Sequence, residues 1–147
     1  MISPELIGTC VAAGTVLIER SRLRLFAAAV GLREPVYLDA EAARAAGYPD
    51  LLVPPTFCFT LETDLPGRRP IPQVLGVAPE RVLHGEQEIE WVNDAFAGQA
   101  VTVDSRITGI ESRKGGAIEL VERRTDVIHA DGRPVAHLRN VVVVKRG

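Results

Sequence analysis

The sequence has too few cysteines for a disulfide framework, because Cys10 and Cys58 are the only two in 147 residues. A chain of this length nevertheless buries enough surface to be stable without disulfides or a structural metal. Residues 1–147 are therefore predicted to form a single domain. Cys58 stands between two phenylalanines, where a buried thiol is a simpler interpretation than a nucleophile.

The chain also lacks a marked excess of charge and any long apolar run. Its formal net charge is −2 at pH 7, which gives no reason to expect nucleic acid or an anionic membrane surface as a partner. No apolar stretch approaches the roughly 18 residues of a membrane span. The first residues include Glu5 and lack the basic segment of a secretory signal. The sequence therefore predicts a cytoplasmic protein without a membrane or nucleic-acid partner.

Motifs for metals and nucleotides are missing as well. The three histidines, His84, His129 and His137, show no ligand spacing with cysteines or carboxylates. The sequence contains no phosphate-binding glycine loop and no Gly-x-Ser-x-Gly motif. We therefore expect neither a metal nor a cofactor.

The first part of the chain predicts a short strand followed by an amphipathic helix. Residues 16–18 are apolar and favour a strand, and Ser21 is the predicted N-cap of the helix. Gly31 is predicted to end this helix, since glycine tolerates the left-handed conformation. The apolar positions of the helix have the spacing of one buried face: Leu23, Phe26, Ala27 and Val30.

Two more helices are predicted before residue 64. Asp39 is a plausible N-cap for a short helix over residues 40–46, and capping explains this carboxylate without catalysis. Pro54 and Pro55 favour the start of a third helix, because proline fits the first helical turn. That helix, over residues 56–63, is apolar on several sides and is therefore predicted to be buried.

The second half predicts an antiparallel sheet. A proline-rich irregular connection over residues 64–80, with one helical turn near Ile71, leads into it. Four strands with period two or continuous apolar character follow: 83–91, 101–108, 117–129 and 135–144. In the first of them, His84 stands at the same alternate positions as Glu86, Glu88 and Glu90 and is expected on the same face of the strand. The three glutamates are expected to form a solvated acidic stripe. The fold class predicted from pattern alone is α+β with an antiparallel sheet.

A segment before the short helix, Gly-Leu-Arg-Glu-Pro-Val-Tyr-Leu-Asp, carries a family resemblance. It resembles the Asp-x-Asn-Pro-x-His-x-Asp motif of MaoC-like (R)-specific hydratases and dehydratases. Pro35 and Asp39 fall in frame with that motif. Leu32 stands at the position of the catalytic Asp, Tyr37 at that of the catalytic His, and Glu34 replaces Asn.

Three further motifs extend the resemblance over nearly the whole chain. They are Pro-Pro-Thr-Phe at residues 54–57, His-Gly-Glu-Gln at 84–87 and Ala-Gly at 97–98. In this order they resemble the N-terminal MaoC-type dehydratase domain, which also occurs in fatty-acid-synthase-type dehydratases. The resemblance implies a single hot-dog fold, in which an antiparallel sheet wraps around a buried central helix.

The resemblance also implies a function. It identifies the chain as a subunit of a 3-hydroxyacyl-thioester dehydratase or enoyl-thioester hydratase, with substrates on coenzyme A or acyl carrier protein. Because the Asp/His pair is absent, a hot-dog partner is expected to supply it, and both a homodimer and a heterodimer stay open. Two alternatives are a hot-dog thioesterase using Glu62 and a non-enzymatic acyl-CoA-binding or assembly protein.

No residue is a firm catalytic candidate. Leu32 cannot transfer a proton, and Tyr37, with an ordinary pKa near 10, is a poor base at neutral pH. His84 and Glu34 are the catalytic candidates, although a structural strand histidine and an exposed loop glutamate are the simpler interpretations. The substrate-binding candidates are Tyr37, Pro55, Thr56, Phe57, His84 and Gly85.

Overall fold

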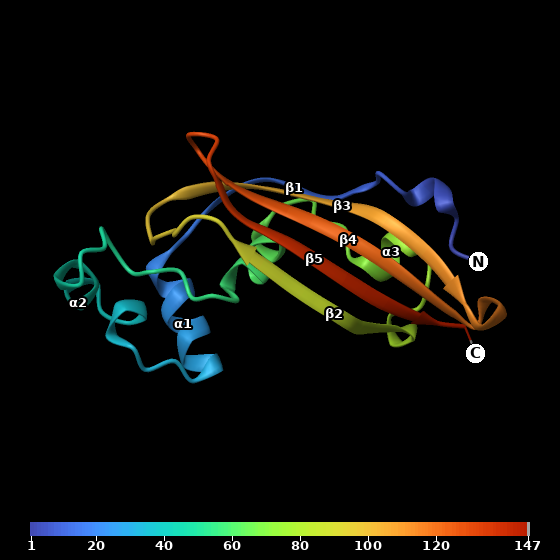
Figure 1. Cartoon of the computed structure of the whole chain (residues 1–147), viewed down its shortest axis with the longest axis horizontal. Helices are drawn as coiled ribbons and strands as arrows, with labels where there is room; N and C mark the ends of the chain where they lie inside the picture. Colours follow the sequence, from blue (N-terminus) through green and yellow to red (C-terminus); the bar gives the residue numbers. More distant parts are fainter. Residues whose placement is uncertain (147) are drawn as a thin grey trace.

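The structure, a computed structural model, describes residues 1–146 and contains a five-stranded sheet in which all neighbouring strands are antiparallel. The strand order is β1-β3-β4-β5-β2, and the strands run along the long axis of the molecule (Figure 1). Their bounds are β1 Cys10–Leu17, β2 Val82–Trp91, β3 Ala100–Arg113, β4 Ile118–His129 and β5 Pro134–Lys145. The predicted α+β class is confirmed.

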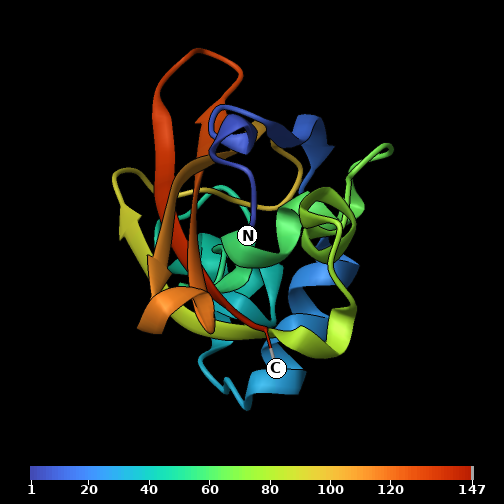
Figure 2. The ribbon, with the colours of Figure 1, turned by 90° about the vertical axis from the view of Figure 1, so that its right-hand side faces the viewer.

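The helices lie on one face of the sheet and near both of its ends (Figure 1). Three are α-helices: α1 Arg20–Val30, α2 Ala40–Ala45 and α3 Ile71–Leu75. Five are 3-10 helices: η1 Pro4–Leu6, η2 Pro35–Tyr37, η3 Phe57–Asp64, η4 Pro79–Arg81 and η5 Lys114–Gly116. In Figure 2 the green segments, which include η3 and α3, lie beside one face of the sheet. We call this the inner face. The helices α1 and α2 form a separate lobe at one end of the sheet (Figure 1).

The buried central helix exists, but its type differs from the prediction. It is a 3-10 helix over Phe57–Asp64 rather than an α-helix over residues 56–63. The hydroxyl of Thr60 donates to the carbonyl of Phe57 at 2.8 Å, and that of Thr63 donates to the carbonyl of Thr60 at 2.6 Å. Side-chain bonds of this kind compete with regular α-helical backbone bonding. The buried residues of η3 are Phe57, Cys58, Leu61 and Glu62.

The first α-helix begins earlier than predicted. Its N-cap is Glu19, whose carbonyl accepts the N–H of Leu23 at 3.2 Å, so Ser21 lies inside the first turn and is not the cap. Leu23 and Ala27 are buried as the spacing predicts, but Val30 is 52% exposed at the helix end. The prediction of a full buried stripe was therefore wrong at its last position.

Two other predicted helix ends are confirmed. Gly31 follows α1 in the left-handed region, with φ of 77°. Asp39 caps α2, because its Oδ1 accepts the N–H of Glu41 at 2.8 Å and that of Ala42 at 3.4 Å. Capping thus accounts for this carboxylate, as the sequence suggested.

The first strand is much longer than the predicted 16–18, because small residues hide its period. At Gly14 an added Cβ would lie 2.8 Å from Cδ2 of Leu65, the residue after η3. The absent side chain therefore lets this apolar residue pack directly on β1.

The four strands predicted in the second half are confirmed, with the hairpin at Asp131 and Gly132 joining β4 to β5.

The alternation predicted for β2 breaks at Gly85. A β-bulge lies between His84, which pairs with Val142, and Glu86, which pairs with Val141. At Gly85 an added Cβ would lie 2.9 Å from Val143 Cγ2. Because a bulge inserts one residue, it resets which face the side chains occupy. The predicted common face of His84 and the three glutamates is therefore wrong: His84 borders the inner face.

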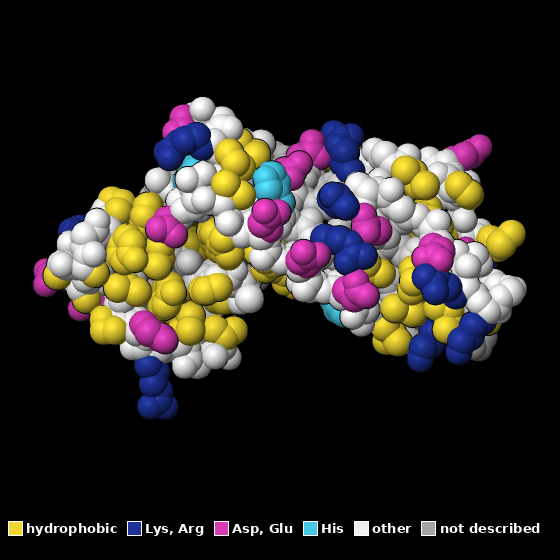
Figure 3. Space-filling view, in the orientation of Figure 1, with side chains coloured by type: hydrophobic (Ala, Val, Ile, Leu, Met, Phe, Trp, Pro, Cys, Tyr) yellow, Lys and Arg dark blue, Asp and Glu magenta, His cyan; other side chains and the backbone are white. Residues whose placement is uncertain are grey.

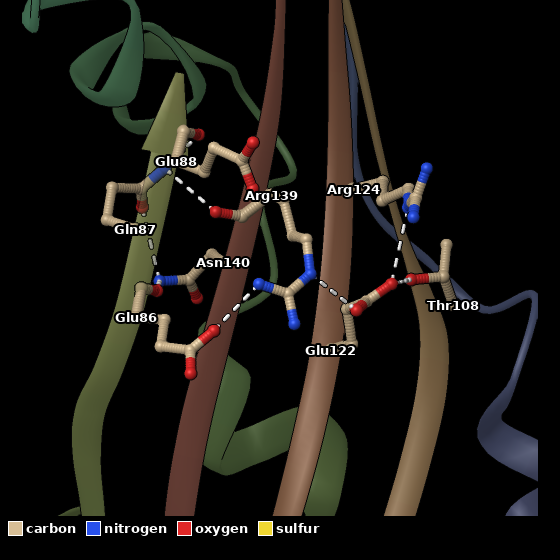
Figure 4. A network of polar contacts seen from close by, with 8 residues as sticks. All are labelled: Glu86, Gln87, Glu88, Thr108, Glu122, Arg124, Arg139 and Asn140. Carbon is tan, nitrogen blue, oxygen red and sulfur yellow. Dashed lines mark hydrogen bonds and ion pairs between the residues drawn. The ribbon is translucent and has the colours of Figure 1, made fainter. Parts of the chain in front are cut away.

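The opposite, outer face carries interspersed charges, as Figure 3 shows over the sheet. Arg139 of β5 donates to Glu86 Oε2 at 2.8 Å and to Glu122 Oε2 at 2.7 Å, which links β2, β5 and β4 (Figure 4). Glu86, Glu88 and Glu90 are all exposed, so the predicted solvated acidic stripe is confirmed. Within residues 1–146, no helix has the length and apolar character to cross a membrane.

Candidate functional site

A cavity of about 520 Å³ lies between the inner face of the sheet and the segment that runs from η3 to η4. Ligand pockets in proteins have volumes of roughly 300–1,000 Å³. Much of the wall is apolar and proline-rich: Phe59, Pro70, Ile71, Pro72, Pro79, Val82 and Val142. The cavity is therefore large enough and apolar enough to hold an organic ligand.

A buried ion pair forms part of the cavity wall. Arg123 of β4 donates through one nitrogen, Nη1, to both carboxylate oxygens of Glu62, at 2.6 and 2.8 Å. The residues are 6% and 5% exposed, so both charges are removed from water. Arg68 adds a more distant contact, with its Nε 3.8 Å from Glu62 Oε1. The two charges neutralise each other and form a polar floor beside the apolar part of the wall.

Asn140 of β5 extends this polar floor. It lies directly opposite Arg123 in the β4–β5 register, and both side chains line the cavity. Its Nδ2 donates to the carbonyl of Glu86 at 3.1 Å and to Gln87 Oε1 at 3.2 Å, and Figure 4 shows the bond to Gln87. Three buried polar atoms of cavity-lining residues are left without a partner, Asn140 Oδ1 and Arg123 Nε on this floor and Arg22 Nε elsewhere in the wall.

The mouth of the cavity carries positive charge. Arg22 and Arg68 line it with side chains that are 39% and 34% exposed, far more than the 7% of Arg123. Arg22 is paired with Asp64, at 2.8 Å between Nη2 and Oδ2. An acidic or phosphorylated group outside the cavity would thus meet basic side chains at the entrance.

His84 is the predicted catalytic candidate that the structure brings to the cavity. The bulge at Gly85 turns its ring inward, where it meets Phe59 edge to face with 5.9 Å between ring centres. Val82 and Val142 line the same part of the wall. The ring is well placed to contact a bound ligand, and Gly85 contributes through the backbone geometry that it permits.

Glu34 and Tyr37 lie elsewhere, in the lobe formed by α1 and α2. Tyr37 belongs to η2 and is half-buried, while the Glu34 carboxylate is exposed and accepts the N–H of Arg33 at 3.0 Å. Burial raises the pKa of Tyr37, and the nearby negative charge of Glu34 raises it further. Leu32 is half-buried beside them. None of these three lines the cavity that contains His84.

Pro55, Thr56 and Phe57 lie where the lobe meets η3. The carbonyl of Pro55 accepts a hydrogen bond from Trp91 Nε1 at 2.6 Å. The N–H of Phe57 donates to the carbonyl of Pro54 at 3.0 Å, and its ring is 2% exposed and packs edge to face on another phenylalanine. Thr56 is exposed. Of these three predicted substrate-binding residues, Pro55 and Thr56 are exposed and Phe57 is buried.

Sequence reasoning missed Arg123 and Asn140. Both lie on the same face of their strand as buried apolar side chains. Arg123 is two residues from Val121, and Asn140 is two residues from Leu138 and from Val142. A charged or amide side chain in the apolar phase of a strand was the available signal. Within the described residues, no group of three His, Cys, Asp or Glu side chains is placed to hold a metal ion.

The chain matches the family model described as "FAS1-like, dehydratase domain region" over residues 5–138. A "UPF0336 protein" of Streptomyces griseus is 39% identical over 118 residues, which cover 80% of this chain and 77% of the relative. A "UPF0336 protein" of Clavibacter michiganensis is 33% identical over 145 residues, which cover 98% and 96% of the two chains.

Solved structures show the same fold. A "MaoC-like dehydratase" superposes with a TM-score of 0.81 at 25% identity, covering 97% of this chain and 43% of that one. A chain of the HadBC (3R-hydroxyacyl-ACP dehydratase) complex of Mycobacterium tuberculosis gives 0.76 at 20% identity, covering 97% and 99%. A chain of the ChsH1–ChsH2 complex of the same organism gives 0.70 at 20% identity, covering 92% and 86%. The predicted hot-dog fold is confirmed.

Proposed function

The chain belongs to the FAS1-like dehydratase domain family, and on that basis we propose that it is the substrate-binding subunit of a 3-hydroxyacyl-thioester dehydratase or enoyl-thioester hydratase. Its substrate would be carried on coenzyme A or acyl carrier protein, and a second hot-dog protein would supply the catalytic Asp and His. One observation carries the proposal: the chain has a ligand-sized cavity, while Leu32 and Tyr37 stand where the resemblance to the MaoC-like motif puts the catalytic Asp and His.

The chemistry explains why a partner is needed. Elimination of water from a 3-hydroxyacyl thioester requires a base for the α-proton and an acid for the departing hydroxyl. Leu32 has no ionisable group, and the raised pKa of Tyr37 makes its hydroxyl an even poorer base at neutral pH. A Glu34 carboxylate on the surface of the lobe does not reach the cavity. On this proposal, Leu32, Tyr37 and Glu34 do not supply the two proton transfers, and the partner does.

Binding is the function that the cavity supports. Its apolar wall suits an acyl chain, and its basic mouth, with Arg22 and Arg68, suits the phosphates of coenzyme A or of a phosphopantetheine arm. We propose that His84 contacts the bound chain, that Gly85 positions this ring, and that Thr56 and Tyr37 line the route from the partner's catalytic pair. Pro55 and Phe57 would support that route through packing.

Pairing with another hot-dog protein follows from the sheet edge. β2 is an edge strand of ten residues, and a long edge of this kind is available to pair with another strand. Leu25 and Val30 of α1 and Val92, just after β2, are exposed apolar side chains, and apolar atoms gather at the lobe end in Figure 3. Two of the structures with this fold, HadBC and ChsH1–ChsH2, are described as complexes.

Co-expression with a hot-dog protein encoded beside this chain tests the proposal. The mass of each purified species and its rate of crotonyl-CoA hydration would be measured. Activity that appears only in a heteromer is the expected result. Full activity of the chain by itself would overturn the subunit assignment, and thioester binding without turnover in every assembly would select a non-enzymatic binding protein.

A matched pair of histidine variants tests the site. In the active heteromer, His84→Gln is expected to raise KM about tenfold, the effect of losing one good contact. His137→Gln is the control, since this histidine lies on the outer face beside Asp126. Equal kinetics of the two variants would remove His84 from the site.

The ion pair of Glu62 with Arg123 argues against a thioesterase that uses this carboxylate as its nucleophile or base.

A further inference from the structure

The polar floor of the cavity is unusual for a site that would hold a plain hydrocarbon chain. Arg123 Nε is a hydrogen-bond donor and Asn140 Oδ1 is an acceptor, and both are buried without a partner. Their residues are 6% and 3% exposed. A buried polar group without a partner is costly, so a ligand that leaves both atoms unsatisfied binds less favourably than one that pairs with them.

The hydrogen-bond pattern fixes which atoms are free. Asn140 Nδ2 donates to Glu86 O and Gln87 Oε1, and the amide nitrogen of Gln87 donates to the carbonyls of Glu88 and Arg139. These carbonyl acceptors orient both amides, so the free atom of Asn140 is its oxygen. Arg123 is fixed in the same way, because Nη1 already holds Glu62.

A single ligand group that serves both free atoms has to bridge two neighbouring residues. Arg123 and Asn140 are direct cross-strand neighbours on the inner face, and such pairs have Cβ atoms about 4.5–5.5 Å apart. A hydroxyl can accept from Arg123 Nε and donate to Asn140 Oδ1 at the same time. A carboxylate would be repelled by Asn140 Oδ1 and by Glu62, a ketone would satisfy the donor alone, and an alkyl end would satisfy neither.

The position of the floor decides which part of a thioester reaches it. The exposed Arg22 and Arg68 lie at the mouth, and the buried Arg123 and Asn140 lie at the inner end. Since the carrier stays in solvent, the pantetheine arm follows it through the mouth and the acyl chain occupies the depth. We propose that this cavity selects thioesters whose acyl chain bears a hydroxyl group beyond the reacting carbons. This selectivity rests on the proposed function.

Calorimetric binding to the full chain, alone and in complex with its hot-dog partner, tests this proposal. The probes are ω-hydroxyacyl thioesters of increasing chain length, each beside the unsubstituted acyl thioester of the same length, on coenzyme A and on acyl carrier protein. At the length that matches the cavity depth, the hydroxylated chain is expected to bind about tenfold more tightly. Free coenzyme A is included to measure binding of the pantetheine arm alone.

Three variants assign the effect to the floor. Asn140→Leu removes the acceptor, and the double variant Glu62→Leu with Arg123→Met replaces the ion pair by apolar side chains of similar size. Both are expected to abolish the preference for the hydroxyl and to strengthen binding of the plain chain. Asn93→Leu is the matched control, because its Nδ2 also donates to a backbone carbonyl, that of Pro134, away from the cavity. It is expected to keep the preference.

The outcomes distinguish a failure of the hydroxyl selectivity from a failure of the proposed function. If plain and hydroxylated chains bind equally at every length, water serves the floor; the selectivity is then wrong, but the substrate-binding role stands. If free coenzyme A binds as tightly as any thioester and loses affinity in Asn140→Leu, the pantetheine arm occupies the floor and the selectivity is again wrong. If no thioester binds in any assembly, the proposed function fails as well.

Discussion

Arg123 and Asn140 face each other across β4 and β5, yet their hydrogen bonds run in opposite directions. Arg123 bonds to Glu62 on the central helix η3, whereas Asn140 bonds to the edge strand β2. The pair therefore joins the helix, the centre of the sheet and the strand that carries His84. The two residues also leave one buried donor, Arg123 Nε, and one buried acceptor, Asn140 Oδ1, without a partner.

Breaking the ion pair on one side should be far more harmful than removing it. Glu62→Ala leaves a buried, unpaired guanidinium and is expected to lower the free energy of unfolding by about 3–5 kcal/mol. The double variant Glu62→Leu with Arg123→Met is expected to be close to neutral, because apolar replacement of a buried pair is often tolerated. Urea unfolding measures both.

The control for this experiment is the exposed pair of Glu111 and Arg113, whose side chains are 59% and 58% exposed. Glu111→Ala is expected to leave the unfolding free energy almost unchanged, since exposed pairs contribute little. A loss in Glu62→Ala no larger than in Glu111→Ala would contradict the assignment of a desolvated charge pair.

The bulge glycine should tolerate no side chain. Gly85→Ala would place a Cβ 2.9 Å from Val143 Cγ2 and 3.0 Å from the carbonyl oxygen of Val141. We expect a loss of about 1–3 kcal/mol in unfolding free energy from this overpacking, together with weaker thioester binding as His84 is displaced. Gly109→Ala is the comparison, because its Cβ would meet Glu122 Cβ at an ordinary 3.5 Å. Equal stability of the two variants would argue against a required glycine at the bulge.

The link between α1 and the segment after α2 should give the protein an acid-sensitive contact. The hydrogen bond from the Arg20 guanidinium, with help from the Leu51 N–H, lowers the pKa of Asp50 to about 2 from its ordinary 3.8. A carboxyl with a lowered folded pKa stabilises the fold above its unfolded pKa, and this contribution is lost as pH falls from about 4 toward about 2.

Asp50→Asn is therefore expected to flatten the acid side of the stability profile, measured by urea unfolding at several pH values. In an Arg20→Ala background the same substitution should have a much smaller effect, because the two residues act as a pair. An unchanged pH profile in Asp50→Asn would show that this contact does not contribute.

The two cysteines should differ in reactivity. Burial raises the pKa of the Cys58 thiol to about 12, and the residue is 2% exposed, whereas Cys10 is half-buried near the start of β1. Because the thiolate is the reactive form, iodoacetamide at neutral pH is expected to label Cys10 first and Cys58 only on unfolding. Mass spectrometry of the peptides distinguishes the sites, and rapid native labelling of Cys58 would mean that η3 opens readily.

Much of the fold follows from local features of the chain. The period of two in the second half and the helix ends at Gly31 and Asp39 appear in the structure as predicted. The helical type of η3 does not, because Thr60 and Thr63 bond back to carbonyls three residues earlier. Helix starts and types depend on such bonds, which composition describes poorly.

The sequence predicted the antiparallel strands of the second half, the resemblance to the family, and Leu32 and Tyr37 in place of the family's Asp and His, because each of these depends on residues close together in the chain. The structure was needed to show that the bulge at Gly85 places His84 on the inner face, and that Glu62 contacts Arg123, 61 positions later in the chain. Alternation along a strand tells which side chains share a face, but not where a bulge resets it or which distant segment covers it.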